Sequence, residues 1–229
     1  MRSLVHAVAL LARPRTVLFA VSLSSLALLS GCASTNRKQK GGAIGAATGG
    51  AVGGLIGRNN GSTSRGAIIG AVVGGAVGVV IGHQMDQQAK ELKVDIPGAT
   101  VERVGEGIQV TFASGLLYDF DTDAIRIDAA ENLRNLATSL NKYPKTELMI
   151  VGHTDALGSA AYNQGLSIRR ANAASAYLVS QGVSASRVRT AGKGELEALA
   201  PNGTEAGRQA NRRIEVAIFA NASARKAPN

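Results

Sequence analysis

The stretch LMIVGHTDALGSAAYNQGLSIRRA, residues 148–171, constrains the fold more than any other part of this chain. It opens with an apolar run, 148–151, which is long enough for a buried strand and too short for a helix. A polar break follows, and Asn163 is a residue type that caps helices, so a helix is predicted from there to Gly182, which suits a C-cap. We therefore expect a strand, a loop and a helix in succession, as in domains that pack a sheet against helices.

Polar side chains of this unit are expected to lie around one crevice. Asp155 follows the strand at its C-terminal end, the edge at which open α/β sheets place their ligands. Asn163 and Arg170 share one face of the predicted helix, and the rest of that face is apolar. The unit therefore sets an acid, an amide and an arginine around a single crevice.

The N-terminal residues 1–31 have the pattern of a signal peptide, with a basic start and an apolar run over 16–29. Residues 29–32, LSGC, resemble the lipobox of bacterial lipoproteins. The resemblance implies that Cys32 is acylated and becomes the mature N-terminus, and several acyl chains give stable anchoring. Ala33, where an Asp would be a signal for the inner membrane, favours the outer membrane. The alternative is an ordinary cleavage site beside a free cysteine.

After a polar tether over 32–40, the composition changes sharply. Residues 41–82 hold more than half of the 28 glycines, which recur every four residues in two halves, 41–57 and 66–82. This small-xxx-small pattern is typical of packed membrane helices, and in water each glycine costs a helix about 1 kcal/mol relative to alanine. The segment resembles the glycine zippers of outer-membrane lipoproteins, so we expect a glycine-rich helical hairpin that contacts the membrane or packs against another copy as a homo-oligomer. A flexible linker is the alternative.

Residues 83–98 are polar and predict a linker that contains a short helix over 85–92. A folded domain is expected over 99–220, followed by a disordered tail over 221–229. Within the domain, strands are expected at 100–104, 108–112, 148–151, 188–191 and 214–219, and a first helix at the capping-box spacing of Asp128 and Glu131.

The last expected strand, 214–219, alternates in a way that places two arginines. Arg212 has the parity of the apolar Ile214, so we expect it to point inward at the mouth of the sheet. An inward arginine needs an anionic partner or ligand. Arg213 has the opposite parity and is expected to be solvated and paired with Glu215.

The motifs GHTDALGSAAYN, LSIRRANA, AGKG and GRQANRRIEV, in this order and spacing, resemble the OmpA-like peptidoglycan-anchoring domain over about residues 108–219. With the lipobox and the glycine repeat, the whole chain resembles a glycine-zipper outer-membrane lipoprotein. The resemblance implies an α/β (α+β sandwich) fold with a mixed sheet packed against helices, and no cofactor. It also implies lipid anchoring in the outer membrane with the C-terminal domain in the periplasm.

That family binds the peptide stem of peptidoglycan, chiefly diaminopimelate, whose side chain ends in an ammonium and a carboxylate. By resemblance, Asp155 pairs with the ammonium and Arg170 holds the carboxylate in bidentate fashion. Asn163 would hydrogen-bond nearby polar groups of the ligand, and Asp121 and Arg212 would complete the pocket. Each residue also has a structural alternative: an internal Asp155–Arg170 ion pair, helix or loop caps at Asn163 and Asp121, and a bridge at the rim for Arg212.

Three positions limit the resemblance or add nothing to the site. Leu157 stands where the family often has a hydroxyl residue that contacts the ligand, so one polar contact is expected to be missing. Ala198 replaces a usual proline in the loop after AGKG, which leaves the shape of that loop open. His153 is expected to be packed rather than to bind a ligand.

Composition narrows the class of function. The net charge of +9 suits an anionic polymer or a membrane surface but also follows from solubility alone, and only 3% aromatic residues argue against a nucleic-acid stacking platform. No HxxxH motif or Cys/His cluster suggests a metal site.

An enzyme is one alternative, with Asp121 and Asp155 as a glycosidase pair, but their arginine-rich surroundings disfavour it. We expect a non-enzymatic tether; a membrane oligomer or pore formed by the glycine repeat, with the OmpA-like domain as its wall anchor, is the other alternative.

Overall fold

The computed structural model describes residues 62–73, 79–119 and 121–225 of the chain. The expected signal peptide, the acylation site Cys32, the tether and the first half of the glycine repeat lie outside these residues and stay predictions. In the part of the chain that the structure describes, no helix has both the length and the apolar character needed to cross a bilayer.

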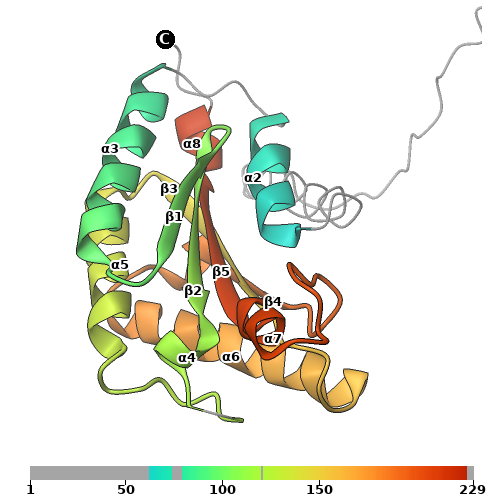
Figure 1. The fold of residues 1–229 in the computed structure, drawn as a ribbon. Coiled ribbons are helices and arrows are strands. Elements are labelled where there is room, and N and C mark those ends of the chain that lie inside the picture. The colour runs from blue at the N-terminus through green and yellow to red at the C-terminus, as the bar shows by residue number, and fades with distance from the viewer. Residues whose placement is uncertain (1–61, 74–78, 120, 226–229) are drawn as a thin grey trace, which may run out of the picture. The chain divides into compact units, whose positions relative to one another are not determined.

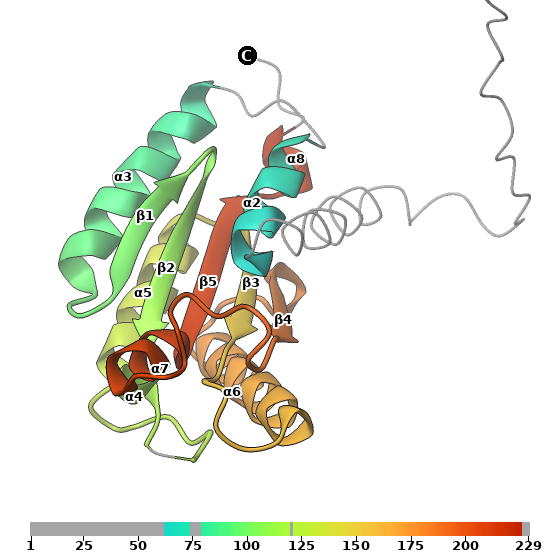
Figure 2. The same cartoon turned by 45° about the vertical axis from the view of Figure 1, so that its right-hand side comes forward.

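A five-stranded mixed sheet in the order β1-β2-β5-β3-β4 forms the centre of the domain (Figure 2). β1 (Thr100–Val104) and β2 (Gly107–Ala113) form an antiparallel hairpin. β5 (Arg213–Ala220), the last strand in the chain, lies antiparallel between β2 and β3 (Thr146–Gly152). β4 (Val188–Gly192) is the parallel neighbour of β3. The C-terminal strand therefore joins the N-terminal hairpin to the strand–loop–helix unit.

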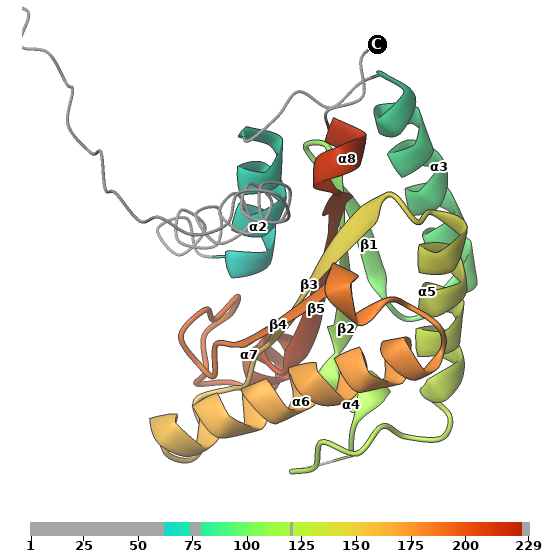
Figure 3. The ribbon, with the colours of Figure 1, turned by 180° about the vertical axis from the view of Figure 1, so that it is seen from behind.

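Helices cover both faces of this sheet. α3 (Val79–Asp95), α5 (Ala130–Lys142) and α6 (Ala160–Ser180) pack their leucines and alanines against β2, β3 and β5 in the main core. Figures 1 and 3 show α2 (Thr63–Val73) on the opposite side of the strands from α3 and α5. The predicted fold class, a mixed sheet packed against helices, is confirmed.

The alternation predicted for the last strand is confirmed on its core side. Ile214, Val216 and Ile218 all belong to the main core, and Val216 lies opposite Val110 in β2 and Ile150 in β3. These cross-strand apolar contacts at the middle of the sheet are the unit of its stabilisation.

Residues 83–98 do not form the expected linker, because most of them belong to α3. The helix runs over Val79–Asp95, well beyond the predicted 85–92. Met85, Ala89 and Leu92, at steps of four and three residues, are buried in the main core. The segment was predicted as a linker because most of its residues are polar. Its few apolar residues nevertheless form a stripe along one face of the helix, and that face packs on the core.

Two predicted helix caps are wrong. Ser159 caps α6 by accepting a hydrogen bond from the backbone N–H of Tyr162 at 3.2 Å, so Asn163 lies inside the first turn instead of capping it. α5 begins after Ala129 without a side-chain cap, and Asp128 pairs with Arg126 at 2.8 Å. In both cases a competing residue two to four positions away makes the contact that decides the helix start.

The prediction that Arg213 is solvated is wrong. Its pairing with Glu215 is confirmed, with Nε 2.7 Å from Oε1, but Arg213 is only 1% exposed. Arg213 donates to the backbone oxygen of Glu197, in the loop after β4, at 3.0 Å, and α2 covers Ala217 and Phe219 farther along the same strand. Every residue of β5 is buried.

The chain also stays ordered past β5, where a disordered tail was expected from 221 onward. α8 (Ala222–Arg225) follows the strand, and Ala224 and Arg225 are buried. Asn221 caps this turn by accepting a hydrogen bond from the backbone N–H of Ala224 at 2.9 Å.

Candidate functional site

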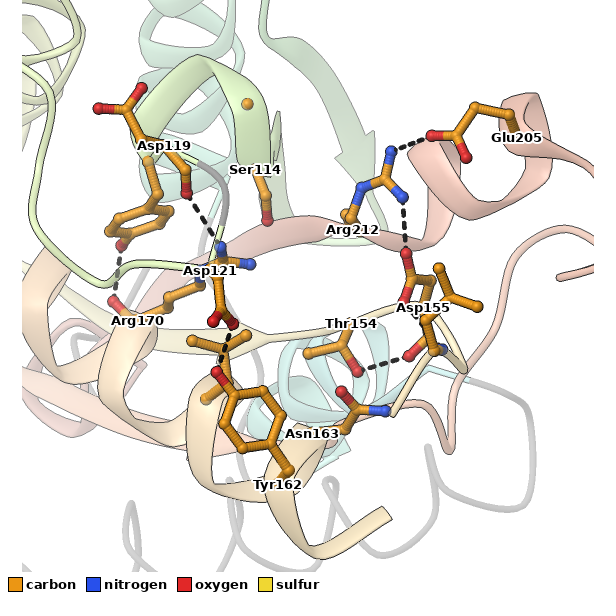
Figure 4. Close-up of a pocket in the computed structure, with 14 residues that line it drawn as sticks. Ser114, Asp119, Asp121, Thr154, Asp155, Tyr162, Asn163, Arg170, Glu205 and Arg212 are labelled. Atoms are coloured by element: carbon orange, nitrogen blue, oxygen red, sulfur yellow. Dashed lines mark hydrogen bonds and ion pairs between the residues drawn. The ribbon is translucent and has the colours of Figure 1, made fainter. Parts of the chain in front are cut away.

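A pocket of about 380 Å³ opens where β3 ends and α6 begins (Figure 4). Its walls also come from α4 (Ser114–Leu117), from the loop after it and from α7 (Glu205–Asn211). All the binding residues expected from the sequence line this one pocket: Asp121, Asp155, Asn163, Arg170 and Arg212. The structure brings them together from four separate stretches of the chain.

Glycines at the ends of β3 and β4 let α6 lie directly against the sheet beside this pocket. A Cβ on Gly152 would lie 2.1 Å from the backbone oxygen of Ser167, and one on Gly192 would lie 2.5 Å from its Oγ. The backbone N–H of Gly194 donates to the same Oγ at 2.9 Å. The Gly-Lys-Gly run therefore packs against the helix that carries Arg170.

One side of the pocket carries a network of ion pairs between three residues, Asp155, Arg212 and Glu205. Asp155 is buried at 7% exposure, and its Oδ2 lies 2.6 Å from Nη1 of Arg212. Arg212 reaches Glu205 with its other terminal nitrogen at 2.5 Å. The hydrogen bond to Glu205, supported by Asp155, raises the pKa of Arg212. Arg212 lies just before β5, so the expected inward arginine at the mouth of the sheet has the anionic partners that such a group needs.

Arg170 occupies the other side of the pocket and is held differently. Its Nε donates to the backbone oxygen of Thr122 at 2.8 Å, and its Nη2 to that of Asp119 at 3.4 Å. The guanidinium lies over the ring of Tyr118, 5.3 Å from its centroid. Burial lowers the pKa of Arg170, the direction expected of a cation removed from water. Arg170 is therefore a buried cation held chiefly by neutral groups.

Asn163 lies between these two sides. It is 2% exposed, and its Nδ2 donates to Oε2 of Glu195 at 2.8 Å. This bond fixes the orientation of the amide at the pocket wall. Leu157, the departure from the family pattern, also lines the pocket and is 60% exposed, so it offers the pocket an apolar surface.

Asp121 is held by a contact that the sequence analysis did not foresee. Its backbone has φ 58°, the left-handed region that aspartate tolerates better than most residues. Its carboxylate accepts a hydrogen bond from the hydroxyl of Tyr162, on the first turn of α6, and this bond raises the pKa of Tyr162. Figure 4 shows Tyr162 reaching up to Asp121 from the helix below. The structural alternative of a simple loop cap does not describe this arrangement.

His153 is packed, as expected, and does not line the pocket. It is fully buried, its Nε2 lies 3.7 Å from Oε2 of Glu215, and burial lowers its pKa. Within the described residues, no cluster of histidine, cysteine, aspartate and glutamate could hold a metal ion.

Several residues of the pocket were missed from the sequence. Tyr118 supports Arg170, Tyr162 holds Asp121, and Glu205 holds Arg212. No local pattern marks them, because Tyr118 ends an apolar run and Glu205 lies in a polar segment. Their partners lie 7 to 52 positions away in the chain.

Two family models match this chain. A model of the OmpA family matches residues 117–212, and a model of YMGG-like Gly-zippers matches residues 14–86. The chain is 35% identical to the probable lipoprotein YiaD of Escherichia coli over 59% of its own length and 63% of that protein. It is 34% identical to a peptidoglycan-associated lipoprotein of Mesorhizobium japonicum, over 49% of this chain and 67% of that one.

A porin is also similar to part of the chain. Outer membrane porin F of Pseudomonas fluorescens is 43% identical over 46% of this chain and 32% of the porin. The chain thus spans less than two thirds of the length of porin F and YiaD. These relatives are named as porins and lipoproteins rather than as enzymes.

Solved structures share the fold. A MotB-like protein from Desulfovibrio vulgaris superposes with a TM-score of 0.56 at 19% identity, covering 66% of this chain and 94% of that one. The cell wall anchor of the type VI secretion system (T6SS) from Pseudomonas aeruginosa gives a TM-score of 0.52 at 26% identity, covering 60% of this chain and 97% of that one.

Proposed function

This chain belongs to the OmpA family, and on that premise we propose that it holds the outer membrane to peptidoglycan without a covalent bond to the wall. Relatives that share the domain are named peptidoglycan-associated lipoproteins, and a structure with the same fold is described as a cell wall anchor. In this proposal, lipid on Cys32 holds the membrane, and the domain that carries the pocket holds the wall from the periplasm. The glycine repeat upstream of the described residues would contact the membrane or a second copy.

The observation that carries the proposal is the separation of charge across one pocket. Asp155 and Arg212 lie on one side, and the guanidinium of Arg170 lies beside Asp121 on the other (Figure 4). The internal Asp155–Arg170 ion pair, the structural alternative, is not the arrangement seen, because Arg212 takes the place beside Asp155. An acid and an arginine that face the same space, each held by other groups, suit a ligand with two opposite charges.

We assign diaminopimelate of the stem peptide to this space. Arg170 is buried and its hydrogen bonds go to carbonyl oxygens, so a ligand carboxylate would give its guanidinium a charged hydrogen-bond acceptor. Asp155 uses one oxygen for Arg212 and the other for the backbone N–H of Leu157, at 3.0 Å. A carboxylate has about four acceptor sites, so it can also receive a ligand ammonium. A pocket of about 380 Å³ is in the range for small ligands.

Co-sedimentation of the purified full chain with peptidoglycan sacculi tests this proposal. We expect the wild-type chain to pellet with sacculi, and Asp155→Asn and Arg170→Ala to lose binding by at least about 30-fold, because truncating one member of a buried charge contact costs about 2–5 kcal/mol. Glu131→Gln and Arg134→Ala change an exposed acid and an exposed arginine on α5 and are expected to bind normally. Equal retention of all four variants would contradict the proposal.

A further inference from the structure

α2 covers the sheet face that lies opposite the main core. Ala67, Ile68 and Ala71 of this helix form a second buried cluster with Ala217 and Phe219 of β5. The partly buried Val104 and Met149 border this cluster from β1 and β3. The segment begins within the glycine repeat that the sequence suggested for membrane contact, yet its apolar face lies on the chain's own domain.

Buried carboxylates of the domain hold the N-terminal end of α2. The backbone N–H of Thr63 donates to Oε2 of Glu197 at 3.0 Å, and the hydroxyl of Thr63 donates to the same carboxylate. The hydroxyl of Ser64 donates to Glu215. Thr63, Ser64, Glu197 and Glu215 are each 7% exposed or less. Negative charge at a helix N-terminus satisfies its free N–H groups and its dipole.

A cation of the domain holds the opposite end of the same helix. Arg225 in α8 is 8% exposed, and its Nη1 donates to the backbone oxygen of Ala71 in the last turn of α2. On the side of the helix, Arg65 donates to Glu102 at 2.8 Å and to Gln109 at 2.9 Å. The domain thus presents acids to the positive end of α2 and an arginine to its negative end.

The sheet also has a place shaped for this helix. Gly107 begins β2, and a Cβ there would lie 2.5 Å from Cγ2 of Ile68 and 2.6 Å from the backbone oxygen of Ile218. Only glycine lets Ile68 approach the strand so closely. Polar, apolar and steric contacts therefore all fit the same docked position.

We propose that residues 62–73 of the glycine repeat are an integral part of the OmpA domain, which they cover as a docked helix, and that they do not enter the bilayer. α2 has 11 residues, about 16 Å of helix, whereas a bilayer core is about 30 Å thick. Its Ser-Thr-Ser start is matched to carboxylates of the domain, which the hydrocarbon core of a bilayer does not supply. Membrane contact by this repeat then falls to residues outside α2, and this conclusion is independent of what the pocket binds.

The docked position also sets the reach of the lipid anchor. If the domain begins at Ser62, residues 33–61 join it to the acylated Cys32, and a fully extended chain of that length spans at most about 100 Å. The distance from which the domain can reach the wall would be set by this stretch alone, because the following residues are fixed to the sheet.

Hydrogen exchange of the α2 amides in the full chain tests the proposal, measured in detergent and in vesicles of phosphatidylethanolamine and phosphatidylglycerol. Ile68→Asp places a charge against Phe219, whereas Ile69→Asp, the matched control on the same helix, changes a side chain that is 46% exposed. We expect α2 to be protected equally in both media, exchange to rise at least tenfold in Ile68→Asp, and Ile69→Asp to match the wild type. Protection that appears only in vesicles, or equal exchange in the two variants, would overturn the proposal.

A second variant keeps the proposal testable if Ile68→Asp unfolds the whole domain. Arg225→Ala removes the arginine from the end of α2 without adding charge to the apolar cluster. We expect it to speed exchange at the C-terminal turn of α2 by a few fold, while the amides of Ile150 and Val216 in the central strands exchange as in the wild type. Unchanged exchange in that turn would count against the docked position.

Discussion

Asp155 and Arg170 line one pocket from two different elements, and each is held in place by other partners. Asp155 lies 2.6 Å from Arg212, and Arg170 donates to the backbone oxygen of Thr122 at 2.8 Å. The two charges are therefore fixed before any ligand arrives. Preorganisation of this kind lowers the ordering cost of binding, and it makes the site sensitive to the residues that support the two charges.

The packing of α6 on β3 is expected to be among the least tolerant contacts of the domain. A Cβ on Gly152 would lie 2.1 Å from the backbone oxygen of Ser167, so Gly152→Ala must displace the helix or the strand. We expect a loss of about 1–3 kcal/mol, seen as a lower midpoint of denaturant unfolding. Gly203→Ala, where a Cβ meets nothing within 4 Å, should leave the midpoint unchanged. Similar midpoints for the two variants would show that the helix does not sit this close.

Tyr162→Phe is expected to weaken binding to sacculi severalfold and to leave the fold intact. The change removes only the hydroxyl that donates to Asp121, in a side chain that is 43% exposed. Tyr177→Phe removes a hydroxyl that donates to Ala130 instead, at 3.1 Å, and serves as the control. Co-sedimentation with sacculi measures both, and a normal affinity for Tyr162→Phe would remove Asp121 from the proposed site.

Acid is expected to destabilise the domain through His153. Burial lowers the pKa of this imidazole in the folded state below its ordinary value of 6.5. The unfolded chain therefore binds a proton below pH 6.5 that the folded chain does not, and stability falls as the pH drops through this range, by up to about 1.4 kcal/mol per pH unit. Chemical denaturation at pH 7.5 and 5.5 measures the loss. His153→Asn should flatten the dependence between these values, and an unchanged slope would exclude His153 as its source.

The strand–loop–helix unit and the meeting of its polar residues could be predicted from the sequence. A short apolar run fixes β3, and helical spacing puts Asn163 and Arg170 on one face of α6, so both conclusions need only local pattern. The companions of these residues could not be predicted in the same way. Tyr118 and Tyr162 act on partners distant in sequence, and nothing in their own surroundings marks that role.

The errors at Arg213, in residues 83–98 and in the glycine repeat have one physical source, which is tertiary contact that a local pattern does not show. Arg213 was expected in water because alternation in β5 defines only one apolar face, whereas the loop after β4 and α2 cover the other. Residues 83–98 were expected as a linker because their average polarity hid the stripe of Met85, Ala89 and Leu92. A docked α2 could not be foreseen, because a glycine repeat favours contact with a membrane or a second copy and carries no mark of the chain's own domain.

The most direct test of the account is calorimetric binding of two stem peptides to the purified chain. One carries diaminopimelate with its free side-chain carboxylate (the acid), and the other carries the side-chain amide, which keeps the ammonium (the amide). The proposed site predicts that the amide binds at least tenfold more weakly than the acid, and that Arg170→Ala binds the two compounds equally weakly. Equal affinity of the wild-type chain for the acid and the amide would show that Arg170 does not receive the carboxylate and would contradict the account.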